Sequence, residues 1–187
     1  MTNLQILTTN GQPQWQTVYT PSGDYLAYTR LDGEVDIWKI LSTGMVDTTK
    51  VWHFPLGSLN SRFLTITPNG THIYVSYEGP SLQGISRLDW YSQDTPFVNS
   101  GSFTPLSYPI QVEVSPDGQF LVAVQQVVNK HYLRTYSIQA DGSLVDTGYS
   151  FPYTDTFGDT INNASNLIFV YPPAPTDVPS ELWGKLE

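Results

Sequence analysis

Apolar and polar residues alternate along much of this chain, in short runs interrupted by turn-forming residues. The clearest runs are QTVYTPSGDYLAY at 16–28, LTITPNGTHIYV at 64–75 and QVEVSPDGQFLVAV at 111–124. Alternation with a period of two is typical of strands that bury one face, and a Thr/Ser-Pro-x-Gly turn divides each run in two. Three β-hairpins are therefore predicted.

The turns recur at a nearly constant spacing. Pro21, Pro68 and Pro116 each preset φ at the first corner of a turn, and they lie 47 and 48 residues apart. A fourth copy is expected near position 163, where NNASNLIFV keeps the apolar strand but has lost the proline. A period of this length is typical of a propeller or a solenoid.

Each hairpin is followed by two further predicted strands. The third strand carries an aromatic residue that we expect to pack between neighbouring repeats, and these residues are Trp38, Trp90, Tyr136 and Trp183. A polar turn then leads to a fourth strand, most clearly at the Asp141-Gly142 hairpin signal in IQADGSLVDTGYSF. Each repeat is therefore predicted to be a four-stranded meander.

The fold predicted is an all-β propeller of about four four-stranded antiparallel blades in a single domain spanning 1–187. The expected repeats are 16–62, 63–109, 110–156, and 157–187 completed by 3–9. In this arrangement the N-terminal strand joins the C-terminal blade and closes the ring, which hides its edges. A β-sandwich is disfavoured because nothing in a sandwich requires four similar repeats.

Composition excludes several classes of function. The chain has 8 Lys and Arg against 17 Asp and Glu, so it should be repelled by nucleic acid and by anionic membranes. Without cysteine it has no disulfide, thiolate zinc site or cysteine nucleophile. No signal peptide or long apolar segment is predicted, and the cellular location stays open.

The segments VEVSPDGQFLVAV and LRTYSIQADGSLVDTG resemble blades of lactonase-type propellers, the YVTN-repeat group, and more broadly WD-like blades. This group includes 6-phosphogluconolactonase and carboxymuconate-cyclising enzymes, and it usually closes about seven blades. Three arrangements are therefore open: a four-bladed ring, two chains sharing one larger ring, or part of a longer protein. The initial Met1 favours the first two.

The resemblance implies that catalytic groups would converge on the channel, where the predicted inner strands supply Arg62, Glu113 and Asp159. Glu113 and Asp159 lie 46 residues apart, so neighbouring blades could direct both carboxylates at one calcium ion. However, the chain has no Asp-rich calcium loop, no G-x-S-x-G elbow and no metal-binding histidine spacing. The expectation is no metal, no cofactor and no defined catalytic set.

Two other groups of residues suggest binding. The segment VVNKHYLR, predicted as a loop, gathers Lys130, His131, Tyr132 and Arg134 in an acidic chain and could bind an acidic partner. Exposed tyrosines could instead stack on sugar rings, with Tyr77, Tyr132 and Tyr153 as candidates.

The missing catalytic set favours a non-enzymatic interaction or structural module. Such a module would bind a protein partner or assemble with itself, for example as a subunit of a phage virion or tail. The alternatives are a lactonase-like hydrolase or cyclase, and a carbohydrate-binding propeller. Nucleic acid and membrane are not expected partners.

Overall fold

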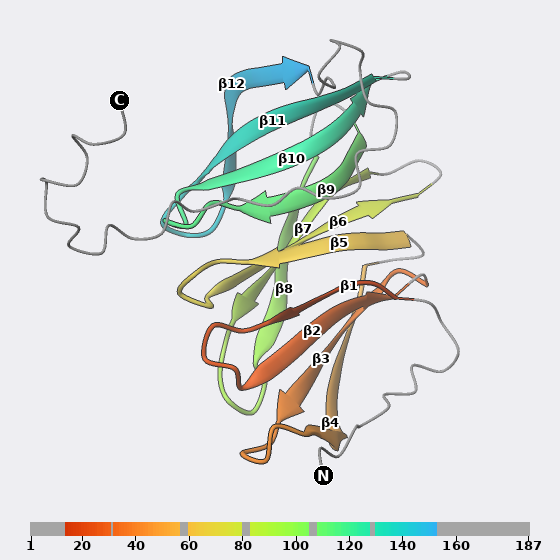
Figure 1. The fold of residues 1–187 in the computed structure, drawn as a ribbon, viewed down its shortest axis with the longest axis vertical. Helices are drawn as coiled ribbons and strands as arrows, with labels where there is room; N and C mark the ends of the chain where they lie inside the picture. The colour runs from red at the N-terminus through yellow and green to blue at the C-terminus, as the bar shows by residue number, and fades with distance from the viewer. Residues whose placement is uncertain are drawn as a thin grey trace, which may run out of the picture.

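The computed structural model describes residues 14–30, 32–56, 60–79, 83–104, 108–127 and 130–152, and these form three four-stranded antiparallel sheets (Figure 1). Blade 1 contains β1 (Gln14–Tyr19), β2 (Tyr25–Arg30), β3 (Glu34–Ile40) and β4 (Val46–Pro55). Blade 2 contains β5 (Asn60–Ile66), β6 (His72–Glu78), β7 (Gln83–Trp90) and β8 (Phe97–Phe103). Blade 3 contains β9 (Tyr108–Val114), β10 (Phe120–Val127), β11 (Lys130–Ile138) and β12 (Leu144–Pro152).

Within each blade the strands pair in chain order, so every blade is a meander, as predicted. The described residues contain no helix, and accordingly none that could cross a membrane. The fourth repeat, residues 3–9 and the expected ring closure lie outside the described residues.

The Thr/Ser-Pro-x-Gly turns form as the sequence predicts. The N–H groups of Gly23, Gly70 and Gly118 each donate a 2.8 Å hydrogen bond across the turn, and all three glycines have φ between 72° and 76°. The turns also touch from blade to blade. A Cβ on Gly70 would lie 3.3 Å from Pro21 Cδ, and one on Gly118 would lie 3.2 Å from Pro68 Cδ. The repeated turn therefore aligns successive blades.

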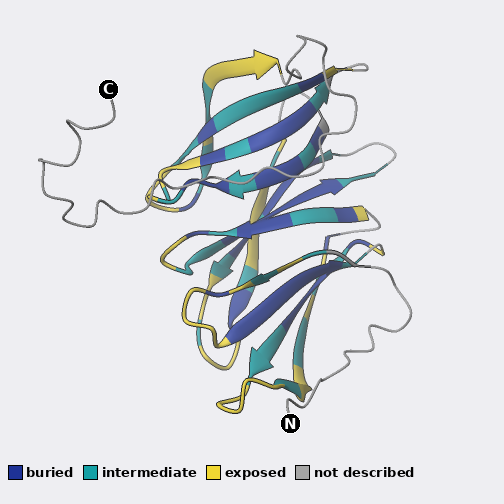
Figure 2. Ribbon diagram, viewed as in Figure 1, coloured by how far each residue is buried: buried dark blue, intermediate teal, exposed yellow. Residues whose placement is uncertain are grey.

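Two hydrophobic cores lie between the blades (Figure 2). Alternation along the middle strand of blade 2 explains this, because Ile73 and Val75 belong to the core shared with blade 1 and Tyr74 belongs to the core shared with blade 3. The inner strands adjoin, with β1 against β5 and β5 against β9. A side-chain hydrogen bond joins each pair, from Leu64 N to Gln16 Oε1 at 2.9 Å and from Val114 N to Thr65 Oγ1 at 3.1 Å.

The third strands of blades 1 and 3 carry their aromatic residues at the same register, with Trp38 opposite Leu26 and Tyr136 opposite Leu121. Tyr136 is fully buried in the core between blades 2 and 3, as predicted, whereas Trp38 is half-buried and belongs to neither core of the described residues. In blade 2 the corresponding residue is Leu88, opposite Ile73. Trp183 lies outside the described residues.

The prediction that all these aromatic residues lie in the core is wrong for Trp90. It lies at the end of β7 and is 38% exposed. Its backbone N–H binds Thr71 O at the position where Ile40 and Ile138 bind in the other two blades. Leu88 lies 20 residues after Pro68, as Tyr136 lies 20 residues after Pro116, so the aligned position of blade 2 holds a leucine and the tryptophan follows two residues later.

Candidate functional site

The inner strands place Glu113 at the junction of blades 2 and 3. Glu113 lies on β9, and the side-chain hydroxyl of Thr65 on β5 donates a hydrogen bond to its carboxyl group. Burial raises the pKa of Glu113 to about 7, because the charged form loses water, while the Thr65 hydroxyl lowers it in part. This carboxyl group can therefore exchange a proton near neutral pH.

Arg62 does not join Glu113 in a catalytic pair. It lies on β5 and forms an ion pair with Glu78 at the end of β6, within its own blade. Asp159 lies outside the described residues, so the alternative in which Glu113 and Asp159 together bind calcium is not tested. Of the channel candidates, Arg62 and Glu113 thus lie on the neighbouring inner strands β5 and β9.

The basic segment at 130–134 is a strand, and the prediction of a loop there is wrong. β11 begins at Lys130, so only the short connection after Val127 lies between the strands. His131 is 3% exposed, and Arg134 Nε lies 2.9 Å from Asp146 Oδ2 on β12. Because His131 is buried and Arg134 is paired with Asp146, Lys130 is the exposed cation of this group. Binding of an acidic partner at this segment stays a prediction.

Of the proposed sugar-binding tyrosines, Tyr77 is buried in the core between blades 1 and 2 and is 6% exposed. It cannot stack on a sugar in this position. Tyr132 is half-buried on β11, and Tyr153 lies outside the described residues.

A polar row in blade 1 was not visible in the sequence. Tyr28, Asp36 and His53 lie opposite one another on β2, β3 and β4. Asp36 is 2% exposed, accepts a 2.6 Å hydrogen bond from the Tyr28 hydroxyl, and lies 2.6 Å from Nδ1 of the exposed His53. Only the register of three strands brings these residues together, so linear spacing carried no signal.

The oxygens of Glu34 and Asp36 and the ring of His53 are close enough to act together as metal ligands. Arg30 already provides the positive charge at this position. Its Nη1 lies 2.8 Å from Glu34 Oε2 and 3.4 Å from Asp36 Oδ2. A metal cation would be repelled by the guanidinium, so the row acts structurally.

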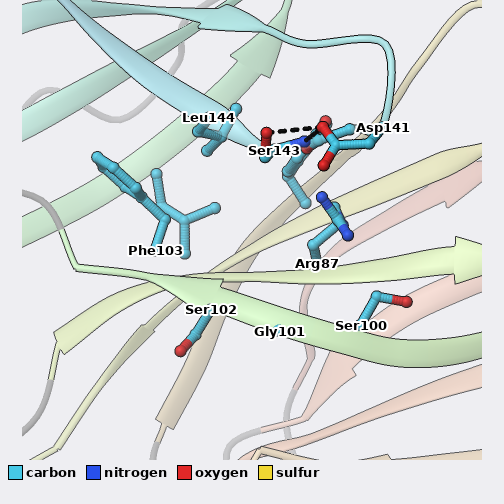
Figure 3. A pocket seen from close by; sticks show the side chains of 11 residues that line it. Arg87, Ser100, Gly101, Ser102, Phe103, Asp141, Ser143 and Leu144 are labelled. Atoms are coloured by element: carbon cyan, nitrogen blue, oxygen red, sulfur yellow. Dashed lines mark hydrogen bonds between the residues drawn. The ribbon is translucent and has the colours of Figure 1, made fainter.

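A cleft of about 360 Å³ separates blade 2 from the β11–β12 hairpin of blade 3 (Figure 3). Figure 3 shows Arg87 reaching from β7 toward the turn that carries Asp141 and Ser143, with Phe103 and Leu144 forming an apolar side. The Tyr74 hydroxyl donates a 2.8 Å hydrogen bond to Gly142 O and so anchors the hairpin on β6.

The charged side chains around this cleft limit the ligands that it can bind. Arg87 Nε lies 3.0 Å from Asp89 Oδ1, and Asp89 also lies 2.7 Å from Nδ1 of His72. Hydrogen bonds from Ser143 lower the pKa of Asp141, with a smaller contribution from the charge of Arg87. The single guanidinium thus faces the carboxyl groups of Asp89 and Asp141, an arrangement that disfavours a phosphorylated ligand.

Comparison with solved structures finds the same fold in propellers. A putative 6-phosphogluconolactonase from Bacteroides fragilis has a TM-score of 0.66 and 16% identity, over 76% of this chain and 40% of that chain. The periplasmic gluconolactonase PpgL of Pseudomonas aeruginosa has a TM-score of 0.65 and 16% identity, over 79% of this chain and 43% of that chain. The Cps50 (Swd1) propeller domain of Myceliophteria thermophila has a TM-score of 0.55 and 19% identity, over 75% of this chain and 43% of that chain.

The structural neighbours are therefore lactonase-like and WD-type propellers, which confirms the resemblance seen in the blade sequences and the all-β propeller fold. At these identities the likeness shows the fold and carries no activity. This chain spans about two fifths of the length of these three structures. No family model and no curated protein matches the sequence.

Proposed function

We propose that this chain is a non-enzymatic interaction module that uses propeller blades as a rigid support for binding a protein partner or further copies of itself. A subunit of a larger assembly, such as a phage virion or tail, is one such role. The observation that carries the proposal is the state of the arginines. All four are ion-paired with carboxylates of their own blade, namely Arg30, Arg62, Arg87 and Arg134.

This pairing bears on catalysis because lactone opening develops negative charge on the carbonyl oxygen, which an enzyme must stabilise with a positive charge or aligned donors. An arginine already held by a carboxylate has little positive potential left for that purpose. The arginines of the described blades thus support the fold rather than a reaction centre.

The outer strand β12 offers a surface that suits a partner. Val145, Tyr149 and Phe151 are 51%, 67% and 58% exposed, and this strand is mostly coloured as exposed in Figure 2. Large exposed apolar side chains on one outer strand are typical of surfaces that bind another protein, where tyrosine and phenylalanine are enriched.

One observation favours a lactonase-like hydrolase as the second candidate. The pKa of Glu113 is raised to about 7, which suits a general acid or base at neutral pH, and two of the three structural neighbours described above are named as lactonases. In this alternative Glu113 would transfer the proton during opening of the lactone ring.

An assay of the hydrolysis of δ-gluconolactone and its 6-phosphate distinguishes the two candidate functions. Hydrolysis releases an acid, so the purified chain and its Glu113→Gln variant can be compared by proton release at pH 7. We expect neither protein to exceed spontaneous hydrolysis. Turnover by the native chain would overturn the proposal, and its loss by a factor of about a hundred or more in Glu113→Gln would establish the alternative.

A further inference from the structure

A second cleft, of about 430 Å³, lies between blades 1 and 2, beside the turns that carry Pro21 and Pro68. We call it the Trp90 cleft. Its polar lining includes Asp24, Lys39, Asn69, Thr71 and Gln93, together with the indole of Trp90. It is separate from the Glu113 region and from the β12 surface, and its volume falls within the roughly 300–1,000 Å³ of small-molecule sites.

The fold does not require a tryptophan at position 90. The corresponding residues of blades 1 and 3 are Ile40 and Ile138, which make the same backbone hydrogen bond. At this position blade 2 has the larger indole ring in place of isoleucine, and Trp90 is 38% exposed. Packing between blades therefore leaves the exposed part of the indole unexplained.

The indole is nevertheless held in a defined orientation. Its ring makes edge-to-face contacts with Tyr25 at 5.5 Å and 63°, and with Phe97 at 5.4 Å and 87°, measured between ring centroids and planes. The Tyr25 hydroxyl in turn donates a 3.3 Å hydrogen bond to Gln93 O. A ring fixed in this way binds a ligand with little loss of side-chain entropy.

The polar groups of the cleft are oriented and available. Asn69 Oδ1 accepts hydrogen bonds from Thr71 N at 3.1 Å and Thr71 Oγ1 at 2.8 Å, which fixes its carboxamide. Among the described residues, the Asn69 amide nitrogen, the Asp24 carboxylate and the Lys39 ammonium have no hydrogen-bonding or ion-pairing partner. The cleft therefore offers both donors and acceptors to a ligand.

We infer that the Trp90 cleft binds an uncharged pyranose sugar. A fixed indole provides the flat apolar surface against which the C–H face of a sugar packs, and the surrounding amide, carboxylate and ammonium can hydrogen-bond its hydroxyls. The lining has one carboxylate and one ammonium, so it has no excess of positive charge that would favour a phosphate or a carboxylate.

The test uses the methyl pyranosides of glucose, galactose, mannose and N-acetylglucosamine, titrated to millimolar concentration into ¹⁵N-labelled protein. The chain has five tryptophans and thus five indole N–H signals. We expect at least one of these sugars to shift the signal that is missing from Trp90→Ile, and that variant to bind at least about tenfold more weakly. Trp90→Ile should fold because isoleucine occupies the same position in blades 1 and 3.

Two further variants make the result specific. Trp38→Leu removes a tryptophan outside the cleft and introduces the residue found at the corresponding place in blade 2, so it should bind the sugar normally. Asp24→Asn keeps the shape of the cleft but removes its carboxylate, and it should weaken binding several-fold even if Trp90→Ile fails to fold.

The inference is overturned if none of the four sugars moves a tryptophan signal, or if they bind equally well to native protein, Trp90→Ile and Asp24→Asn. None of these outcomes bears on lactone turnover, so this site and the proposed function fail separately.

Discussion

Asp36 is buried and Glu113 is half-buried, and different groups surround their carboxylates. Asp36 has the Tyr28 hydroxyl, His53 and Arg30 around its two oxygens. Glu113 has burial acting against its charge and a hydrogen bond from Thr65 that compensates in part. Desolvation penalises an ionised carboxylate unless donors or cations replace the lost water, and this penalty explains the raised pKa of Glu113.

Glu113 should therefore make stability fall as pH rises. Its pKa is about 7 in the folded chain against an ordinary 4.5, so between these values the folded state binds more protons than the unfolded state. The stabilisation is complete below about pH 4.5 and lost above about pH 7. Because the carboxyl is only partly buried, we expect a loss of about 1–2 kcal/mol.

Urea unfolding of native protein and Glu113→Gln at pH 4.5 and pH 7.5 measures this effect. The neutral amide cannot ionise, so the variant should gain about 1–2 kcal/mol relative to the native chain between the two pH values. An unchanged difference between the two proteins would show that Glu113 has an ordinary pKa.

Among the elements, the β11–β12 hairpin is docked on β6 by a close contact. Gly142 has φ of 79°, and a Cβ on it would lie 2.6 Å from His72 Cε1. The same residue accepts the hydrogen bond from Tyr74, and His72 is held by Asp89. The sequence predicted a hairpin at Asp141-Gly142 but not the imidazole packed against it.

Gly142→Ala should therefore cost more than the backbone alone explains. Positive φ costs an alanine about 1 kcal/mol, and displacement of His72 should raise the total to about 2–4 kcal/mol of unfolding free energy. Gly148→Ala is the matched control, because Gly148 has φ of 78° and a Cβ on it would meet nothing within 4 Å. Equal losses in the two variants, measured by chemical denaturation, would contradict the close contact.

For the molecule as a whole, the proposed function places the partner surface on β12. If copies of the chain meet there, light scattering should give a mass that is a multiple of 20.9 kDa. Replacing Tyr149 and Phe151 together by serine should return the mass to that of one chain, because the two rings are 67% and 58% exposed and contribute little to the fold.

Leu41→Ser provides the control for that experiment, since Leu41 is also exposed, at 41%, but lies in the β3–β4 turn. It should leave the mass unchanged. A native chain that scatters as a single 20.9 kDa particle would exclude self-assembly and leave a different protein as the partner.

Local patterns in the chain predicted the turns and most strands of the three described blades, although the start of β11 was wrongly predicted to be a loop. Proline at one corner, glycine at another and alternation between them are local constraints on backbone and burial, so they can be read from spacing alone. The same spacing also located Glu113 on an inner strand.

Which side chains meet depended instead on the folded arrangement of the blades. Strand register placed Tyr28 and His53 on either side of Asp36, left Trp90 at the surface and buried Tyr77 between two blades. Register and packing between blades depend on connection lengths and on contacts among residues tens of positions apart, and linear patterns do not record these. The ion pairs of the four arginines, on which the proposed function rests, likewise depend on the tertiary structure.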